Sequence, residues 1–199
     1  MKILFVLLAL LVGLGGVWSP PNFVWPGPAQ AAGSTDLALI LAVKSRDTEL
    51  VRELLADGAE PESEDWAGWT PLIWASLLLE NDIVISLLDA GADIERIGEG
   101  GKNSGTPLMM AAKKHAGVET VQLLLLHGAR VNGTDQYDRT PLIMAAKYGR
   151  LANVKALLAA GADVTRISML KSWRSALHAA KSRGHAAVAD ILVEAGATE

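Results

Sequence analysis

The sequence predicts an all-α fold in which short helical pairs repeat along the chain and stack, and three observations lead to this prediction. A Gly-Ala dipeptide recurs at intervals of 33 to 37 residues, beginning at Gly58, Gly91, Gly128, Gly161 and Gly196. A Thr-Pro or Ser-Ala dipeptide lies 21 or 22 residues before the last four of these glycines, beginning at Thr70, Thr106, Thr140 and Ser175. Apolar residues between the two dipeptides follow helical spacing, and a fixed period of this length is typical of solenoids.

The unit from Arg139 to Asp163 shows how each repeat is expected to fold. Thr140 suits a helix N-cap because its hydroxyl can accept hydrogen bonds from the free amides of the first turn. The proline after it suits the first helical position, where no N–H is needed. We expect this helix to end at Gly149 and a second helix to end at Gly161 in a left-handed turn. The second helix carries an apolar stripe at i, i+3, i+4 spacing that it cannot bury alone, formed by Val154, Leu157 and Leu158.

These phased motifs resemble the ankyrin repeat through the segments TPLIWAS (70–76), TPLMMAA (106–112), TPLIMAA (140–146) and SALHAAK (175–181). The resemblance implies an ankyrin solenoid of stacked helix-turn-helix units with projecting β-hairpin or loop fingers. Five units would cover about 34–65, 66–98, 102–134, 135–167 and 171–199. The first unit lacks Thr-Pro and is expected to be an N-terminal cap.

The histidines depart from the family's pattern. The family's histidine, which usually ties adjacent repeats by hydrogen bonds, remains only as His178. Packing is therefore expected to replace those bonds, and structural roles are assigned to His178 and His185.

The N-terminal segment reads as a signal peptide at residues 1–31, outside the repeat domain of 32–199. Lys2 precedes an apolar run from Ile3 to Val17, and Ala29-Gln30-Ala31 is a small-residue cleavage site. The run is shorter than the ~20 residues of a membrane-spanning helix. We expect cleavage after Ala31 and export to the periplasm, assuming a bacterial source, with an uncleaved N-terminal anchor as the alternative.

Composition gives the expected stabilisation and charge distribution. The 199 residues are 50% hydrophobic and 20% charged and include no cysteine, so packing must hold the protein together without disulfides. From residue 33 to 99 the chain has 4 basic and 15 acidic residues, a net charge of −11. From residue 100 to 199 it has 13 basic and 7 acidic residues, a net charge of +6. The repeat domain is therefore acidic in one half and basic in the other.

Chemistry-bearing motifs are missing from the sequence. The four histidines have no H-x-x-x-H or H-E-x-x-H spacing, no G-x-S-x-G occurs, and GEGGKNSG (98–105) lacks the order of a phosphate loop. The sequence therefore predicts neither an enzyme nor a cofactor, metal or nucleic-acid site. The acidic cluster in the first finger (Glu60, Glu62, Glu64 and Asp65) is read as solvated surface, with partner recognition as the alternative.

The resemblance implies that a partner binds the concave face formed by the finger tips and the first helices. The matching positions are Trp66, Trp69, Leu77, Leu78, Lys102, Lys113, Lys114, Gln136, Tyr137, Arg139, Lys147, Tyr148, Trp173, Arg174 and Arg183. This set is rich in the residue types that dominate interface hot spots. Two other interpretations stay open: the indoles could cover neighbouring fingers, and the cations could serve solubility. Trp74, inside a first helix, is expected to pack.

Two functions follow from different classes of protein. The first is a monomeric module that binds one protein, as an inhibitor or immunity protein of an exported enzyme or as a helper that stabilises a periplasmic enzyme. The second is a binder of anionic lipid or polyanion surfaces through the basic C-terminal half. It ranks second because no amphipathic basic helix is present.

Overall fold

The computed structural model describes residues 28–98, 105–170 and 173–198, and side chains from residue 35 onward. The chain divides into two compact parts, residues 1–31 and 32–199, of which the second carries the repeats. Ten helices lie in the described residues: α2 (Pro28–Ser45), α3 (Thr48–Ala56), α4 (Pro71–Leu78), α5 (Asn81–Asp89), α6 (Pro107–Ala112), α7 (Val118–Leu126), α8 (Pro141–Lys147), α9 (Leu151–Ala159), α10 (Ala176–Ser182) and α11 (Ala186–Glu194). Lys102 and the rest of the second finger tip lie outside the described residues.

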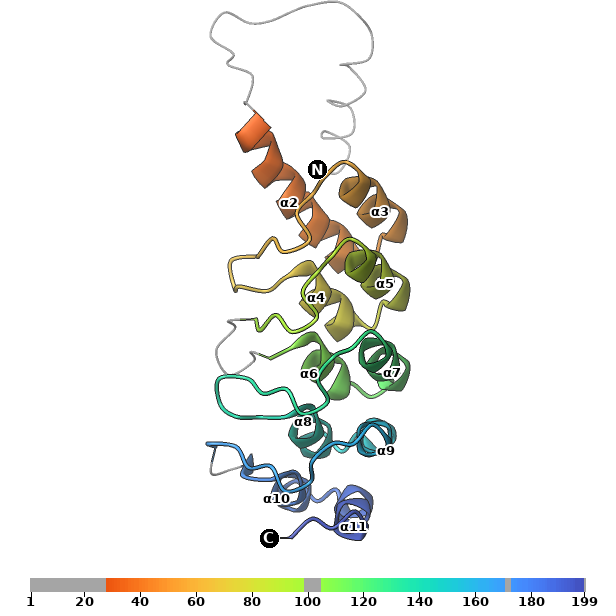
Figure 1. Ribbon diagram of the computed structural model, residues 1–199, viewed down its shortest axis with the longest axis vertical. Coiled ribbons are helices and arrows are strands. Elements are labelled where there is room, and N and C mark those ends of the chain that lie inside the picture. The colour runs from red at the N-terminus through yellow and green to blue at the C-terminus, as the bar shows by residue number, and fades with distance from the viewer. Residues whose placement is uncertain (1–27, 99–104, 171–172, 199) are drawn as a thin grey trace, which may run out of the picture. The chain divides into compact units, whose positions relative to one another are not determined.

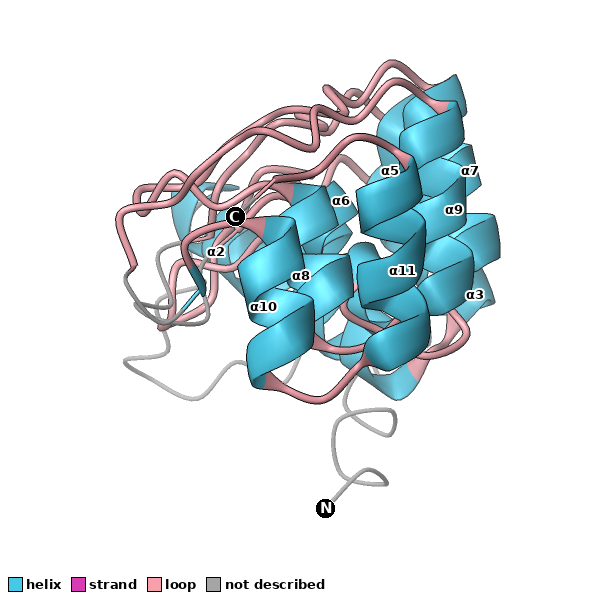
Figure 2. Cartoon of the chain, turned by 90° about the horizontal axis from the view of Figure 1, so that it is seen from below, coloured by secondary structure: helices cyan, strands magenta, loops and turns pink. Residues whose placement is uncertain are grey.

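The helices of the repeat part form two rows, as Figure 1 shows along the stack and Figure 2 shows down it. The first helices α4, α6, α8 and α10 pack in sequence against one another, and the second helices α3, α5, α7, α9 and α11 do the same. One core runs between the rows, and its repeated positions include the buried leucines Leu72, Leu108, Leu142 and Leu177. The predicted all-α repeat solenoid is confirmed.

The predicted helix ends are confirmed at the level of single hydrogen bonds. The hydroxyls of Thr70, Thr106 and Thr140 accept from the backbone N–H three residues later, at 3.4, 3.4 and 3.2 Å. Ser175 does the same at 3.1 Å, although alanine replaces proline in that unit. At the other end, the Gly-Ala glycines all have a positive φ, between 85° and 93°.

The fingers are loops in the described residues, and their only β pairing consists of two isolated bridges, Gly98 with Gly105 and Ile167 with Ser175. Neighbouring units are linked at the bases of the fingers by a repeated hydrogen bond. The side chains of Glu62, Glu95 and Asn132 each accept the backbone N–H of a residue one unit further on, at 2.8, 2.7 and 2.8 Å. The spacing of 31 to 35 residues matches the repeat, so these bonds hold the units in register.

Two of the acidic residues of the first finger therefore have partners inside the protein. Glu62 takes part in the repeated link just described, and Glu64 pairs with Arg96 of the next unit.

Polar bonds also join the helices of successive units, which corrects the expectation that packing alone replaces the family's histidine. Asn153 in α9 is fully buried, and its Nδ2 donates to the backbone oxygens of Ala112 at 2.8 Å and Lys114 at 2.9 Å. The Nε of Arg150 donates to the oxygen of Lys113 at 2.9 Å. The third unit has an extra residue between its helices. Side chains of the fourth unit donate hydrogen bonds to the backbone carbonyls that this irregular turn leaves without a helical partner.

The two histidines with expected structural roles differ in the structure. His185 fulfils its role, since its Nε2 lies 3.1 Å from the oxygen of Lys147 in the preceding unit. Its ring covers Gly149, where φ is +67° and an added Cβ would lie 2.6 Å from the His185 Nδ1. His178 does not, because its side chain is exposed and has no hydrogen bond to another unit among the described residues; its backbone N–H donates to the hydroxyl of Ser175.

Candidate protein-binding face

The first and third fingers are closed by the same turn, built around an aspartate at equivalent positions. The Oδ1 of Asp65 accepts from the backbone N–H of Ala67 at 3.0 Å and of Trp69 at 3.1 Å. The Oδ1 of Asp135 accepts from Tyr137 at 2.9 Å and Arg139 at 3.1 Å. Because the carboxylate ties down the backbone, the side chains between the aspartate and the end of the turn can point outward.

Trp69 and Arg139 end these two turns, and neither lies free on the surface. Trp69 is 8% exposed and packs against Ile73, Met110 and Trp74, with 4.8 Å between the two indole centroids. Arg139 is 0% exposed. The expectation that they present their side chains as finger tips is wrong, because the position before the helix faces the next finger rather than solvent.

Arg139 is instead the buried centre of a cluster. Its Nε donates to the Oδ2 of Asp135 at 2.5 Å, and this aspartate is 5% exposed. The guanidinium carbon lies 5.1 Å from the ring centroid of Tyr137 and 5.9 Å from that of Trp173 in the next finger. A buried charge is stable only when it is paired and hydrogen-bonded, and Asp135 supplies both.

Lys147, at the end of α8, completes the cluster on its outer side. Its Nζ lies 3.2 Å from the ring centroid of Trp173 and 4.7 Å from that of Tyr148. Such contacts between an ammonium group and aromatic faces are favourable, the more so when water is partly excluded. We refer to Tyr137, Arg139, Lys147, Tyr148 and Trp173 as the cation–aromatic cluster, together with Lys113, whose charge acts on Arg139 and Lys147 and whose Nζ lies 5.8 Å from the ring centroid of Trp69.

The two lysines of the cluster have perturbed pKa values. Burial, together with the charges of Lys114 and Arg139, lowers the pKa of Lys113 to about 8. Burial and the charges of Arg139, Arg183 and Lys113 lower the pKa of Lys147, also to about 8. Both lysines are half-buried and lie among other cations, which destabilises their charged form.

A separate contact set lies in the first units. The Oδ2 of Asp65 accepts from Lys44 Nζ at 2.8 Å and from the indole N–H of Trp74 at 2.9 Å. Burial raises the pKa of Asp65, but the hydrogen bonds from Lys44, Trp69, Ala67 and Trp74 outweigh it, so that the pKa is lowered. Trp74 therefore packs within the protein, as expected.

The other residues assigned to the face are spread along the chain. Leu77, Leu78 and Lys114 are half-buried at the ends of α4 and α6. Trp66 is 96% exposed at the tip of the first finger. Gln136, Arg174 and Arg183 are also exposed. The structure thus brings together side chains from the third and fourth fingers and from the ends of α6 and α8. The indole of Trp66 lies apart from them and is exposed.

Two exposed apolar residues on the fourth finger were not among the sequence candidates. Ile167 is 56% exposed and Met169 is 70% exposed. The N–H of Met169 donates to the oxygen of Tyr137 at 3.0 Å, which places it beside the cluster. The sequence feature that could have identified them is the lengthened connection DVTRISMLKSWR (163–174), which contains apolar residues that the repeat pattern does not require.

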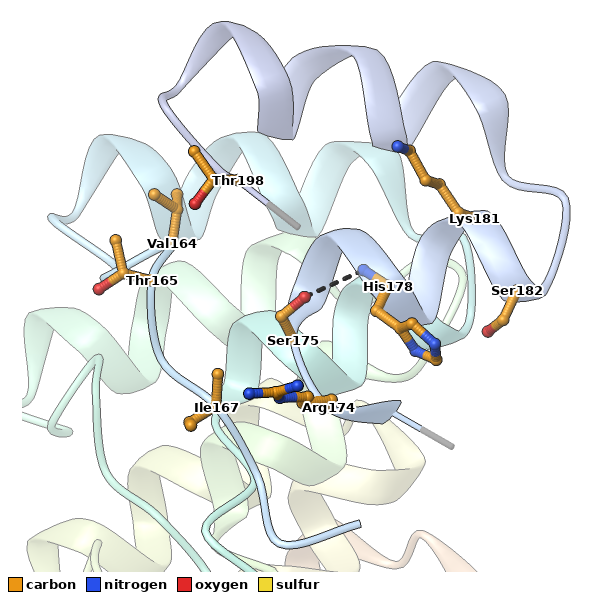
Figure 3. Close-up of a pocket in the computed structure, with 9 residues that line it drawn as sticks. All are labelled: Val164, Thr165, Ile167, Arg174, Ser175, His178, Lys181, Ser182 and Thr198. Atoms are coloured by element: carbon orange, nitrogen blue, oxygen red, sulfur yellow. Dashed lines mark hydrogen bonds between the residues drawn. The ribbon is translucent and has the colours of Figure 1, made fainter. Parts of the chain in front are cut away.

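A pocket of about 460 Å³ opens at the last unit (Figure 3). Arg174, His178 and Lys181 give it a basic lining, together with the hydroxyls of Thr165, Ser175, Ser182 and Thr198. Figure 3 shows these side chains coming from the fourth finger, from α10 and from the C-terminal residues after α11. The pocket brings Arg174 of the predicted set together with His178, whose ring is free to face solvent there.

The part of the chain that the structure describes contains no group of three or more His, Asp or Glu side chains that could hold a metal ion. Among the same residues, no helix has the length and apolar character needed to cross a bilayer.

The family model for ankyrin repeats in three copies matches residues 23–98 and 96–168. The chain therefore belongs to the ankyrin repeat family, whose domains are protein–protein interaction modules and are typically not enzymes.

Two relatives show how the similarity is distributed. The chain is 38% identical over 112 residues to the ankyrin repeat, SAM and basic leucine zipper domain-containing protein 1 of Notamacropus eugenii, covering 54% of this chain and 23% of that protein. It is 32% identical over 160 residues to the B-cell lymphoma 3 protein homolog of Mus musculus, covering 80% of this chain and 35% of that protein. The chain thus spans about a third or less of the length of these relatives.

Proposed function

We propose that this protein is an exported interaction module that binds one partner protein through its fingers and first helices. In this proposal it inhibits or stabilises a periplasmic enzyme. The observation that carries the proposal is the cation–aromatic cluster, in which Tyr, Lys and Arg side chains of one unit meet Trp173 of the next, with the charge of Lys113 from the preceding unit nearby. Aromatic and arginine residues dominate the binding energy of protein interfaces.

Binding to a lipid or polyanion surface is the second candidate, and it has less support. The cations of the C-terminal half are distributed over several units, and Lys113 and Lys147 are half-buried beside aromatic rings. Flat anionic surfaces are better met by exposed basic residues along one amphipathic helix.

The partner-binding proposal can be tested by comparing two exposed apolar side chains. Trp66 is 96% exposed on the first finger, whereas Leu126 is 83% exposed at the end of a second helix. The tagged chain should retain one stoichiometric protein from an extract of the cells that produce it. We expect Trp66→Ala to weaken retention about tenfold or more, as for a hot-spot aromatic. Equal retention by the Trp66→Ala and Leu126→Ala variants would show that the fingers do not bind the partner.

Export can be tested separately by fractionating the producing cells and sequencing the N-terminus of the protein. A periplasmic protein that begins at Ala32 would support the proposed leader of residues 1–31. An intact chain in the membrane fraction would favour the uncleaved anchor. A full-length chain in the cytoplasm would refute export.

A further inference from the structure

Among the described residues, the cation–aromatic cluster holds more positive charge than carboxylates pair with. Among the described residues, the one carboxylate in the cluster's contacts is Asp135, which is bound by Arg139. The seven ion pairs of the described residues include none to Lys113, Lys147 or Arg183. Burial lowers the pKa values of both lysines, and repulsion from Arg139 adds to this effect for each of them.

This arrangement contrasts with the equivalent place in the first units. There the ammonium of Lys44 also lies over an indole, 4.2 Å from the ring centroid of Trp74. It is neutralised by the Oδ2 of Asp65 at 2.8 Å. The equivalent aspartate of the third finger, Asp135, pairs with Arg139 instead, and no ion pair between Asp135 and Lys147 occurs among the described residues. In the part of the chain that the structure describes, an ammonium group over an indole is thus paired with a carboxylate at Lys44, whereas the one at Lys147 is not.

We propose that carboxylate side chains of an acidic segment of the partner protein complete the cluster, bound by the ammonium group of Lys147 beside the rings of Tyr148 and Trp173 and by the ammonium group of Lys113 beside the ring of Trp69. This inference rests on the proposed function and names the chemistry of the partner's binding segment. The two lysines belong to successive units, at the ends of α6 and α8. A peptide segment that crosses the stack would meet them in turn.

The positions of the cations favour a protein segment over a phosphate or a bilayer. Bidentate recognition of phosphate relies on the planar fork of arginine, and here the buried arginine is committed to Asp135. Lys113 and Lys147 are half-buried, with rings 5.8 and 3.2 Å from their Nζ atoms. A single side chain can reach such ammonium groups more readily than a planar headgroup layer can. Carboxylates would also relieve the repulsion among the cations.

A short glutamate homopeptide is the probe for this site. The full chain is titrated with the peptide at low salt, and binding is followed by tryptophan fluorescence, since Trp69 and Trp173 contact the two lysines. Lys113→Met and Lys147→Met should each lower the affinity about tenfold, which corresponds to ~1.4 kcal/mol. Lys155→Met is the matched control, because Lys155 is exposed on α9 and loses the same charge. Circular dichroism checks that each variant is folded.

Specific results would overturn the proposal. It fails if the peptide does not bind, or if Lys155→Met weakens binding as much as the two cluster variants do. It also fails if inorganic phosphate, or vesicles containing phosphatidylglycerol, bind more tightly than the peptide through the same lysines. Self-association of the chain that depends on Lys113 and Lys147 would reassign the cluster to the acidic units of a second copy.

The proposed function and this inference fail in different ways. If a partner protein is retained, but its binding is unaffected by Lys147→Met and by competition with the peptide, the module function stands and the carboxylate site is refuted. If the peptide binds through the lysines but no protein is retained, the carboxylate site stands and the module function is refuted.

Discussion

Replacing Asn153 by alanine should uncouple the third and fourth repeat units. The side-chain amide donates to the backbone oxygens of Ala112 and Lys114 at 2.8 and 2.9 Å in a fully buried position. The variant leaves the buried carbonyl of Ala112 and the half-buried carbonyl of Lys114 without this donor, which costs about 1–3 kcal/mol for each. Removing the Oδ1 of Asn153 returns part of this cost, because that buried oxygen has no partner among the described residues.

We therefore expect Asn153→Ala to lower the free energy of unfolding by about 3 kcal/mol, a large share of the ~5–15 kcal/mol of a typical domain. Urea unfolding at equilibrium measures this loss. Asn132→Ala is the matched control, since the amide of Asn132 also links successive units but does so at the surface, through Gly161 and Asp163. It should cost less than about 1 kcal/mol, because water can replace its bonds.

The shape of the transition gives a second readout. In a repeat protein each unit contacts only its neighbours, so a weakened interface can let the two sides unfold separately. Trp173 lies beyond the weakened interface, whereas Trp66, Trp69 and Trp74 lie before it. A loss of less than about 0.5 kcal/mol for Asn153→Ala, or an equal loss for Asn132→Ala, would refute the reasoning.

Three further predictions concern turns and charges. Gly149→Ala should destabilise by about 2 kcal/mol or more in thermal unfolding, because a left-handed alanine costs ~1–2 kcal/mol and its Cβ meets the ring of His185. Gly184 has φ +74°, and a Cβ added there would meet no atom within 4 Å, so Gly184→Ala should cost only the free energy of the left-handed backbone. Equal losses for the two variants would show that the contact with His185 does not destabilise Gly149→Ala. Asp135→Asn should cost about 3–5 kcal/mol, because it leaves a buried arginine without its counter-charge; a melting temperature close to that of the unchanged protein would refute this. The free energy of unfolding should rise between pH 8 and pH 10, because Lys113 loses its proton near pH 8 when folded but near 10.5 when unfolded, so the unfolded state binds more protons. Lys113→Met should reduce that rise, and an unchanged pH profile would argue against the lowered pKa.

The repeat pattern was sufficient to predict the fold. Thr140 and Gly161 act through the few residues around them, so local rules place helix ends correctly. The same applies to the buried leucines, whose spacing follows the helical period.

The candidate site was predicted less completely, because its chemistry depends on contacts between units. Nothing near Arg139 in the sequence shows that its side chain is buried and surrounded by Tyr137, Asp135 and the Trp173 of the next finger. The role of Asn153 was also missed, because the carbonyls that it binds lie about 40 residues earlier in the chain. Residue type alone did not indicate which of the proposed face residues are exposed and which, like Trp69 and Arg139, are buried.

The turns that Asp65 and Asp135 close have a consequence for how recognition by this protein could be altered. Each carboxylate fixes the backbone through two N–H groups, so the loop keeps its shape without help from the outermost side chains. Trp66 and Gln136, directly after the two aspartates, are exposed. These two positions could be randomised together to select new binding specificities, while the aspartates and the stack beneath remain a constant frame.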